Sequence, residues 1–83
     1  SLWEAVFGKV ISESPLKIET EQRLILTKDF IIIAEHLRER TINVHIDDRT
    51  VAMKIDNSLK KEDTVIMLRQ QGGQRYIVLD REG

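Results

Sequence analysis

The feature that most constrains this chain is its excess of β-branched aliphatic residues. Eleven Ile and six Val outnumber eight Leu about two to one in 83 residues. A branched Cβ loses little further χ1 freedom on a pleated sheet and more in a helix, so this composition favours strands. A chain of this length forms one small domain, whose core removes only about 60% of the unfolded surface from water. We therefore expect an all-β domain whose stability is marginal or borrowed from a partner.

The N-terminal part predicts a long, bent first strand. Residues 4–12 alternate weakly around Gly8, where the missing side chain indicates a bulge or a close approach of another backbone. Ser14-Pro15 then interrupts the run, because proline cannot donate a ladder hydrogen bond. After this kink we expect two short strands, residues 16–19 and 23–26.

The segment 28–40 fits two structures. Phe30, Ile33 and Leu37 have helical spacing, whereas residues 30–33 also form the apolar run of a buried strand. We interpret the three consecutive isoleucines as a strand and residues 35–38 as a connecting turn. One amphipathic helix is the alternative.

The C-terminal half predicts two hairpins. Apolar and polar residues alternate over 42–46 and 51–55 around Asp47-Asp48-Arg49, which predicts a hairpin with one buried face. A polar connection follows, with Leu59 as its expected anchor. The strands 64–70 and 75–80 then flank Gly72-Gly73, which can supply the positive φ values of a tight primed turn.

Several short strands in so short a chain predict a small barrel, because closing the sheet removes edges that would pair with other chains. The expected fold is all-β, a small OB-type barrel of five strands that is partly closed. A single OB-like domain is expected to cover residues 1–83. The long bent first strand with its glycine suits this barrel.

Charge and composition exclude several classes of function. Thirteen Lys and Arg against fourteen Asp and Glu give a net charge of −1, which offers no positive field for nucleic acid or anionic lipid. Without cysteine, a disulfide, a thiolate metal site and a thiol nucleophile are all excluded. No apolar run approaches the roughly 20 residues of a membrane helix, and no signal-peptide pattern precedes Trp3. We expect a soluble protein.

The chain also offers little to a metal or a substrate. His36 and His45 lack a partner at metal-ligand spacing, and Asp47, Asp48 and Asp56 are typical of turns. A strand rather than a helix is expected after the paired glycines, so they are not a phosphate loop. Ser12, Ser14 and Ser58 lack the context of a catalytic serine. We therefore expect no enzyme, no cofactor and no metal.

The four aromatic residues separate a binding role from a packing role. Trp3, Phe7 and Phe30 are interpreted as packing groups, and Tyr76 has a basic neighbour, Arg75. A barrel that stacks single-stranded nucleic acid on aromatics in a basic groove is the alternative function. A lone Trp beside Leu2 either anchors a neighbouring subunit or packs across the open end of the barrel. The predicted interface residues are Leu2, Trp3 and Tyr76.

Four segments of the sequence resemble a known family. They are Phe7-Gly8-Lys9-Val10-Ile11-Ser12, Ser14-Pro15-Leu16-Lys17-Ile18, residues 24–32, and the C-terminal run 65–81 with its Leu-Arg-x-Gln-Gly-Gly-Gln-x-Tyr-x-Val-Leu-Asp-Arg element. They are similar to small baseplate hub and spike proteins of PBSX-type prophages, contractile-tailed phages and phage-tail-like bacteriocins. The similarity is weakest over residues 35–58.

The resemblance implies an OB-like structural protein at the centre of a tail baseplate. It implies a homo-oligomer, a trimer on the tail axis, that contacts the hub protein and the spike tip or neighbouring baseplate subunits, in a virion or tail-like particle made in the bacterial cytoplasm. The chain differs from the family in two ways. It has Lys61-Glu62-Asp63 where a Gly-Asp turn is usual, and residues 1–5 are at most a remnant of the usual N-terminal leader.

Overall fold

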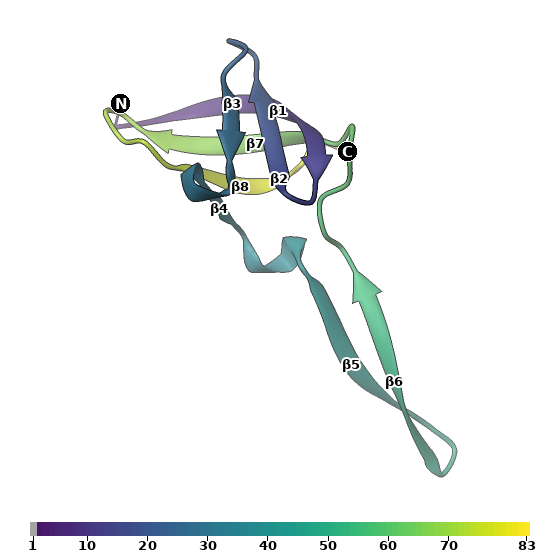
Figure 1. The fold of residues 1–83 in the computed structure, drawn as a ribbon. Helices are drawn as coiled ribbons and strands as arrows, with labels where there is room; N and C mark the ends of the chain where they lie inside the picture. The colour runs from purple at the N-terminus through teal and green to yellow at the C-terminus, as the bar shows by residue number, and fades with distance from the viewer. Residues whose placement is uncertain (1) are drawn as a thin grey trace.

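The computed structural model of the chain describes residues 2–83 and is all-β (Figure 1). The longest strand comes first, and a separate hairpin lies in the middle of the chain. The elements in order are β1 (Trp3–Glu13), β2 (Leu16–Thr20), β3 (Ile25–Thr27), the 3-10 turn η1 (Lys28–Phe30), β4 (Ile31–Ile33), the 3-10 turn η2 (Glu35–Leu37), β5 (Glu39–Ile46), β6 (Arg49–Asp56), β7 (Thr64–Gln70) and β8 (Tyr76–Arg81).

Six of these strands form one curled sheet in the order β3-β2-β1-β7-β8-β4. Its pairs are antiparallel except that β4 and β8 run parallel. The two edge strands, β3 and β4, are joined by η1 alone, so the connection brings the two edges of the sheet together as a half-barrel. As expected, β1 is long and serves two neighbours, with its first part on β7 and its last part on β2.

The core lies inside this curl. Its buried members come from most strands and from both loops beside the hairpin, namely Val10, Ile18, Leu26, Leu37, Leu59, Val65, Met67, Tyr76 and Val78. Of the two alternatives at Gly8, the close approach of another backbone is confirmed, because a Cβ there would lie 3.1 Å from the Glu19 carbonyl oxygen. The Cβ would also lie 2.7 Å from Ile18 Cγ2 and 2.9 Å from Met67 Cε. The register shift in β1 lies further on, between Val10 and Ser12.

The connections agree with most of the sequence predictions. Residues 31–33 form a strand and 35–37 a turn, so the alternative helix is wrong. Leu59 is buried at 6% exposure, which confirms it as an anchor. The Asp47-Asp48 turn has a positive φ at Asp47. In the last hairpin the positive φ belongs to Gly72, and Gly73 N–H donates to Gln70 O at 2.8 Å. The loop covers residues 71–75, because β8 begins at Tyr76 and not at Arg75 as predicted.

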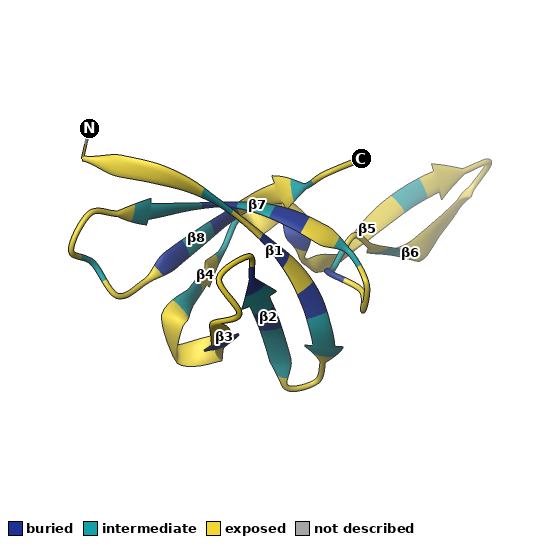
Figure 2. Cartoon of the chain, turned by 90° about the horizontal axis from the view of Figure 1, so that it is seen from above, coloured by how far each residue is buried: buried dark blue, intermediate teal, exposed yellow. Residues whose placement is uncertain are grey.

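The hairpin β5–β6 is an arm that projects from the barrel (Figure 1). Its two strands pair over their whole length, from Glu39 opposite Asp56 to Ile46 opposite Arg49. The molecule is 54 Å long and 26 by 24 Å across. Its length exceeds its width by about the length of an eight-residue strand, roughly 26 Å. The hairpin is as predicted, but the expectation of a buried face is wrong, since its residues are exposed apart from the half-buried Val44 and Ile55 (Figure 2).

One arginine holds the root of the arm to the barrel. Arg81 Nη1 donates to Asn57 Oδ1 at 2.8 Å, and Nη2 donates to the carbonyls of Asn57 and Ser58 at 2.8 and 2.9 Å. Its Nε lies 3.4 Å from Asp63 Oδ2. On the other side of the root, Asn57 Nδ2 donates to the carbonyl of His36 at 2.6 Å. The two chain segments that enter and leave the arm are thereby tied to β8 and to each other.

Candidate interaction surfaces

The first candidate surface is one side of the arm, here called the arm face. Strand pairing places Ile42 opposite Met53 and Val44 opposite Val51. Because side chains alternate across a strand, all the large apolar residues of the arm share one side. The arm face consists of Ile42, Val44, Ile46, Val51, Met53 and Ile55, with Arg40 and Arg49 at its two ends.

The arm face differs sharply from the other side of the hairpin, where the paired residues are polar except Ala52. Ile46 and Met53 are 45% and 46% exposed. An isolated two-stranded hairpin is marginally stable in water, and three or more strands or a covering element are normally needed. The exposed apolar side of this hairpin is therefore a candidate contact surface.

The second candidate surface is the outer side of the curled sheet, here called the outer patch. The register aligns Ala5, Leu68, Ile77 and Ile32 in one row across β1, β7, β8 and β4. Their neighbours on the same strands, such as Met67 and Val78, are fully buried, so this row faces away from the core. Phe7 and Ile66 pair beside it. The outer patch consists of Ala5, Phe7, Ile32, Ile66, Leu68 and Ile77.

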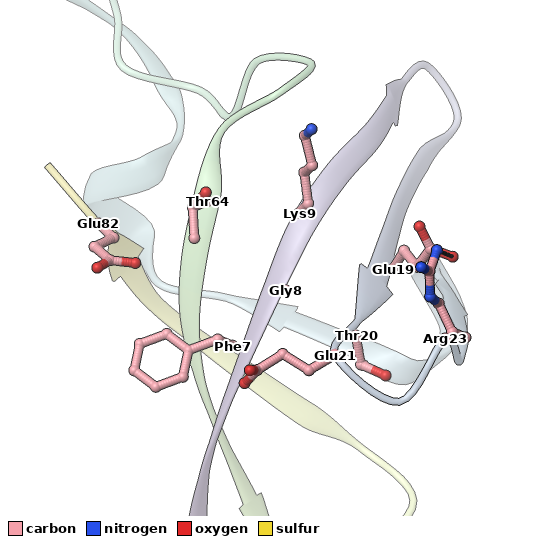
Figure 3. Close-up of a pocket in the computed structure, with 9 residues that line it drawn as sticks. All are labelled: Phe7, Gly8, Lys9, Glu19, Thr20, Glu21, Arg23, Thr64 and Glu82. Carbon is pink, nitrogen blue, oxygen red and sulfur yellow. Dashed lines mark ion pairs between the residues drawn. The ribbon is translucent and has the colours of Figure 1, made fainter.

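A shallow, open cavity of about 620 Å³ adjoins the outer patch (Figure 3). Phe7 forms part of its wall, and Glu82 and Thr64 lie on the same side of the sheet. The other lining groups carry mixed charge, with Lys9 and Arg23 among Glu19 and Glu21. Lys9 is bound by Glu62 at 2.7 Å, and Arg23 lies 3.9 Å from Glu19. This is a solvated surface with paired charges.

The perturbed titrating groups are surface ion pairs. A hydrogen bond from Lys60 and two from Ser58 hold the pKa of Asp56 well below its usual range. A hydrogen bond from Lys9 lowers the pKa of Glu62, and the same bond raises the pKa of Lys9. These pairs lie at the exposed root of the arm and beside β1, where such shifts reflect pairing.

The histidines lie apart from each other. His45 Nδ1 is 3.0 Å from Thr50 Oγ1 on the polar side of the arm, and His36 Nε2 is 3.6 Å from Asp80 Oδ1 at the root. Within residues 2–83, no group of three or more His, Asp or Glu side chains is placed to hold a metal ion. Across the same part of the chain, no helix has the length and apolar character to cross a bilayer.

Comparison with known proteins identifies the family. The model of a family described as "Protein of unknown function (DUF2577)" matches residues 3–81. The chain belongs to the DUF2577 family. No curated protein matches the chain. The DUF2577 match spans β1 to β8, so both the arm face and the outer patch lie within it.

The predicted interface residues of this DUF2577 protein have different surroundings. Leu2 and Trp3 are 72% and 46% exposed at the start of β1. Tyr76 is 8% exposed, because it faces the core and the guanidinium of Arg69 lies 5.9 Å from the centre of its ring. Tyr76 thus has little surface to offer a partner.

Two of the remaining aromatic residues are more exposed than the sequence prediction expected. Phe7 and Phe30 were interpreted with Trp3 as packing groups, but they are 38% and 42% exposed. For Phe7, the error lies in which face of β1 points toward the core. In β1 the inward positions are those of Gly8 and Val10, so Phe7 and Trp3 lie on the outer side.

Sequence reasoning missed the outer patch and the exposure of the arm face in this DUF2577 chain. The alternation of β5 and β6 was visible, but alternation does not say whether the apolar side meets the protein's own core or another molecule. A signal for the outer patch did exist. Residues 65–68 and 76–79 contain apolar residues at successive positions, which indicates strands with apolar side chains on both faces.

Proposed function

We propose that this DUF2577 chain is a structural subunit of a contractile phage tail or a phage-tail-like particle. It is made in the bacterial cytoplasm and joins the centre of the baseplate as a hub or spike protein. The observation that carries the proposal is the pair of apolar surfaces that face away from the core, the exposed arm face and the partly exposed outer patch. An assembly subunit works by presenting complementary faces to its neighbours. The type of particle is inferred from the resemblance of residues 7–12 and 65–81 to baseplate proteins.

We further propose that the curled sheet is an OB-type barrel. In this description β3 and β4 are two halves of one strand that η1 interrupts, which leaves five strands. The OB-fold is a five-stranded, partly open Greek-key barrel. The β5–β6 arm is then a long insertion between the third and fourth strands.

The proposed role is assembly without catalysis. Its partners are other copies of the chain, the hub protein, and the spike tip or neighbouring baseplate subunits. A trimer on the tail axis is the arrangement that the resemblance suggests. The near-neutral net charge of −1 suits contacts made through apolar faces, while exposed ion pairs set the choice of partner more than the affinity.

Light scattering on the purified chain, alone and mixed with its hub protein, tests the role. We expect the chain to self-associate or to form a complex with the hub at micromolar concentration. A chain that stays monomeric and also ignores the hub would refute the role of tail subunit.

One observation favours the alternative function, a single-strand-binding module. Trp3 and Phe7 are exposed on the same side of β1, and bases stack on exposed aromatic side chains. A salt titration of oligonucleotide binding discriminates between the two roles. Phosphate contacts make affinity fall steeply as salt rises, whereas a structural subunit shows no binding at low salt.

A further inference from the structure

The chain exposes more surface than a compact protein of its size. A globular monomer of 9.7 kDa is expected to expose about 5,100 Å², whereas this chain exposes 6205 Å². Its radius of gyration is 15.7 Å, against about 12 Å for a compact domain of this length. The excess of roughly 1,100 Å² is comparable to the ~800 Å² that each partner buries in a standard interface.

The arm face and the outer patch match each other in size. Apolar residues of the arm face run from Ile42 to Ile46, about 13 Å along a strand. The row from Ala5 to Ile32 crosses four strands, which is about 14 Å at the usual strand spacing. Two sheets can pack on such faces about 10 Å apart, with their side chains interdigitated.

The charges beside the two surfaces are opposite. Arg40 and Arg49 lie at the ends of the arm face. On the outer side of the sheet, Asp80 pairs with Ile66, and Glu82 lines the same cavity as Phe7 (Figure 3). Lys9, on the same side of β1 as Phe7, is bound to Glu62 at 2.7 Å. An arm laid on the patch therefore brings arginines toward carboxylates, whereas two arm faces laid together bring arginines toward arginines.

We propose that the arm of one copy docks with its arm face on the outer patch of a neighbouring copy. The occupant of each surface is thus a second copy of this chain. A head-to-tail repeat of this contact whose rotation closes gives a ring, which is the arrangement of the proposed trimer. This inference deepens the proposed assembly role and rests on it, since it names the contact through which the subunits join.

A mixing experiment tests the contact directly. Met53→Asp places a charge on the arm face, and Phe7→Asp places one on the outer patch. We expect light scattering to give a multiple of 9.7 kDa for the unmodified chain and 9.7 kDa for each variant alone. An equimolar mixture of the two variants should give a dimer, because one intact arm meets one intact patch. Asn43→Asp, on the polar side of the arm, is the matched control and should associate like the unmodified chain.

Several outcomes would overturn the inference. These are an unmodified chain that stays monomeric at 100 µM, single variants that still associate, or a mixture that stays monomeric while the unmodified chain associates. The last result would indicate contact between like surfaces. Circular dichroism checks that each variant is folded, and the milder Met53→Ser and Ile32→Ser replace any variant that is not.

Binding to the hub protein separates this inference from the proposed function. A monomeric chain that binds the hub overturns the arm-to-patch contact and leaves the tail role standing. A chain that forms the head-to-tail oligomer but ignores the hub supports the contact and overturns the hub protein as the proposed partner.

Discussion

Replacing Arg81 by methionine should loosen the root of the arm and destabilise the whole chain. Methionine keeps an apolar stem of similar length but removes the donors to Asn57 and Ser58. Hydrogen bonds from a charged donor contribute at most about 1.5–3 kcal/mol each. The acceptors lie near the surface, so water replaces part of each lost bond. The contact with Asp63, whose two side chains are 28% and 26% exposed, adds about 0–1 kcal/mol.

Together these contributions predict a loss of about 2–4 kcal/mol in the free energy of unfolding for Arg81→Met. In a domain of this size, each kcal/mol lowers the melting temperature by roughly 4–8 °C. Urea unfolding followed by far-UV circular dichroism measures the loss. Arg75→Met, in the exposed β7–β8 loop, is the matched control and should change stability by less than about 0.5 kcal/mol. Equal stabilities for the two variants would refute the role of Arg81 as the clamp of the arm.

Three further predictions concern the core and the pH dependence. Gly8→Ala should lower the free energy of unfolding by about 1–3 kcal/mol, because the added Cβ would lie 2.7 Å from Ile18 Cγ2. Urea unfolding measures this loss, and an unchanged urea midpoint would contradict the close packing. Met67→Ala removes a fully buried side chain and should cost about 2–5 kcal/mol in thermal unfolding. The lowered pKa of Asp56 contributes stability that is present above its unfolded value near 4 and is lost as pH falls through the lower folded value. Asp56→Asn should therefore flatten the fall of the urea midpoint below pH 4, and curves of equal slope would show that the Lys60 pair does not matter.

Most of the strands could be predicted because the residues within each strand carry its signal. Alternation located β5 and β6, and the three isoleucines of β4 outweighed the helical spacing around them. Leu59 was identified as an anchor because it is the apolar residue in a polar connection. In each case the sequence around a residue determines its structure.

The sequence did not predict correctly which face of each strand points toward the core. Whether Phe7 or Gly8 faces the core depends on the register between β1 and β7, which are more than 50 residues apart in the chain. The side of Tyr76 depends in the same way on its pairing with Ile31, which turns it toward the core. A period of two reveals that a strand has two faces, and tertiary pairing decides which face is inside.

The arm leaves and re-enters the barrel at one place, between β4 and β7, and this makes its length adjustable. Two residues added to each strand would move the tip about 7 Å outward and keep the same side chains on the same side. One residue added to each strand would turn every side chain beyond it to the opposite side. In the proposed arm-to-patch contact, the length of the hairpin would set the spacing between neighbouring copies in steps of two residues per strand, while the barrel core stays unchanged.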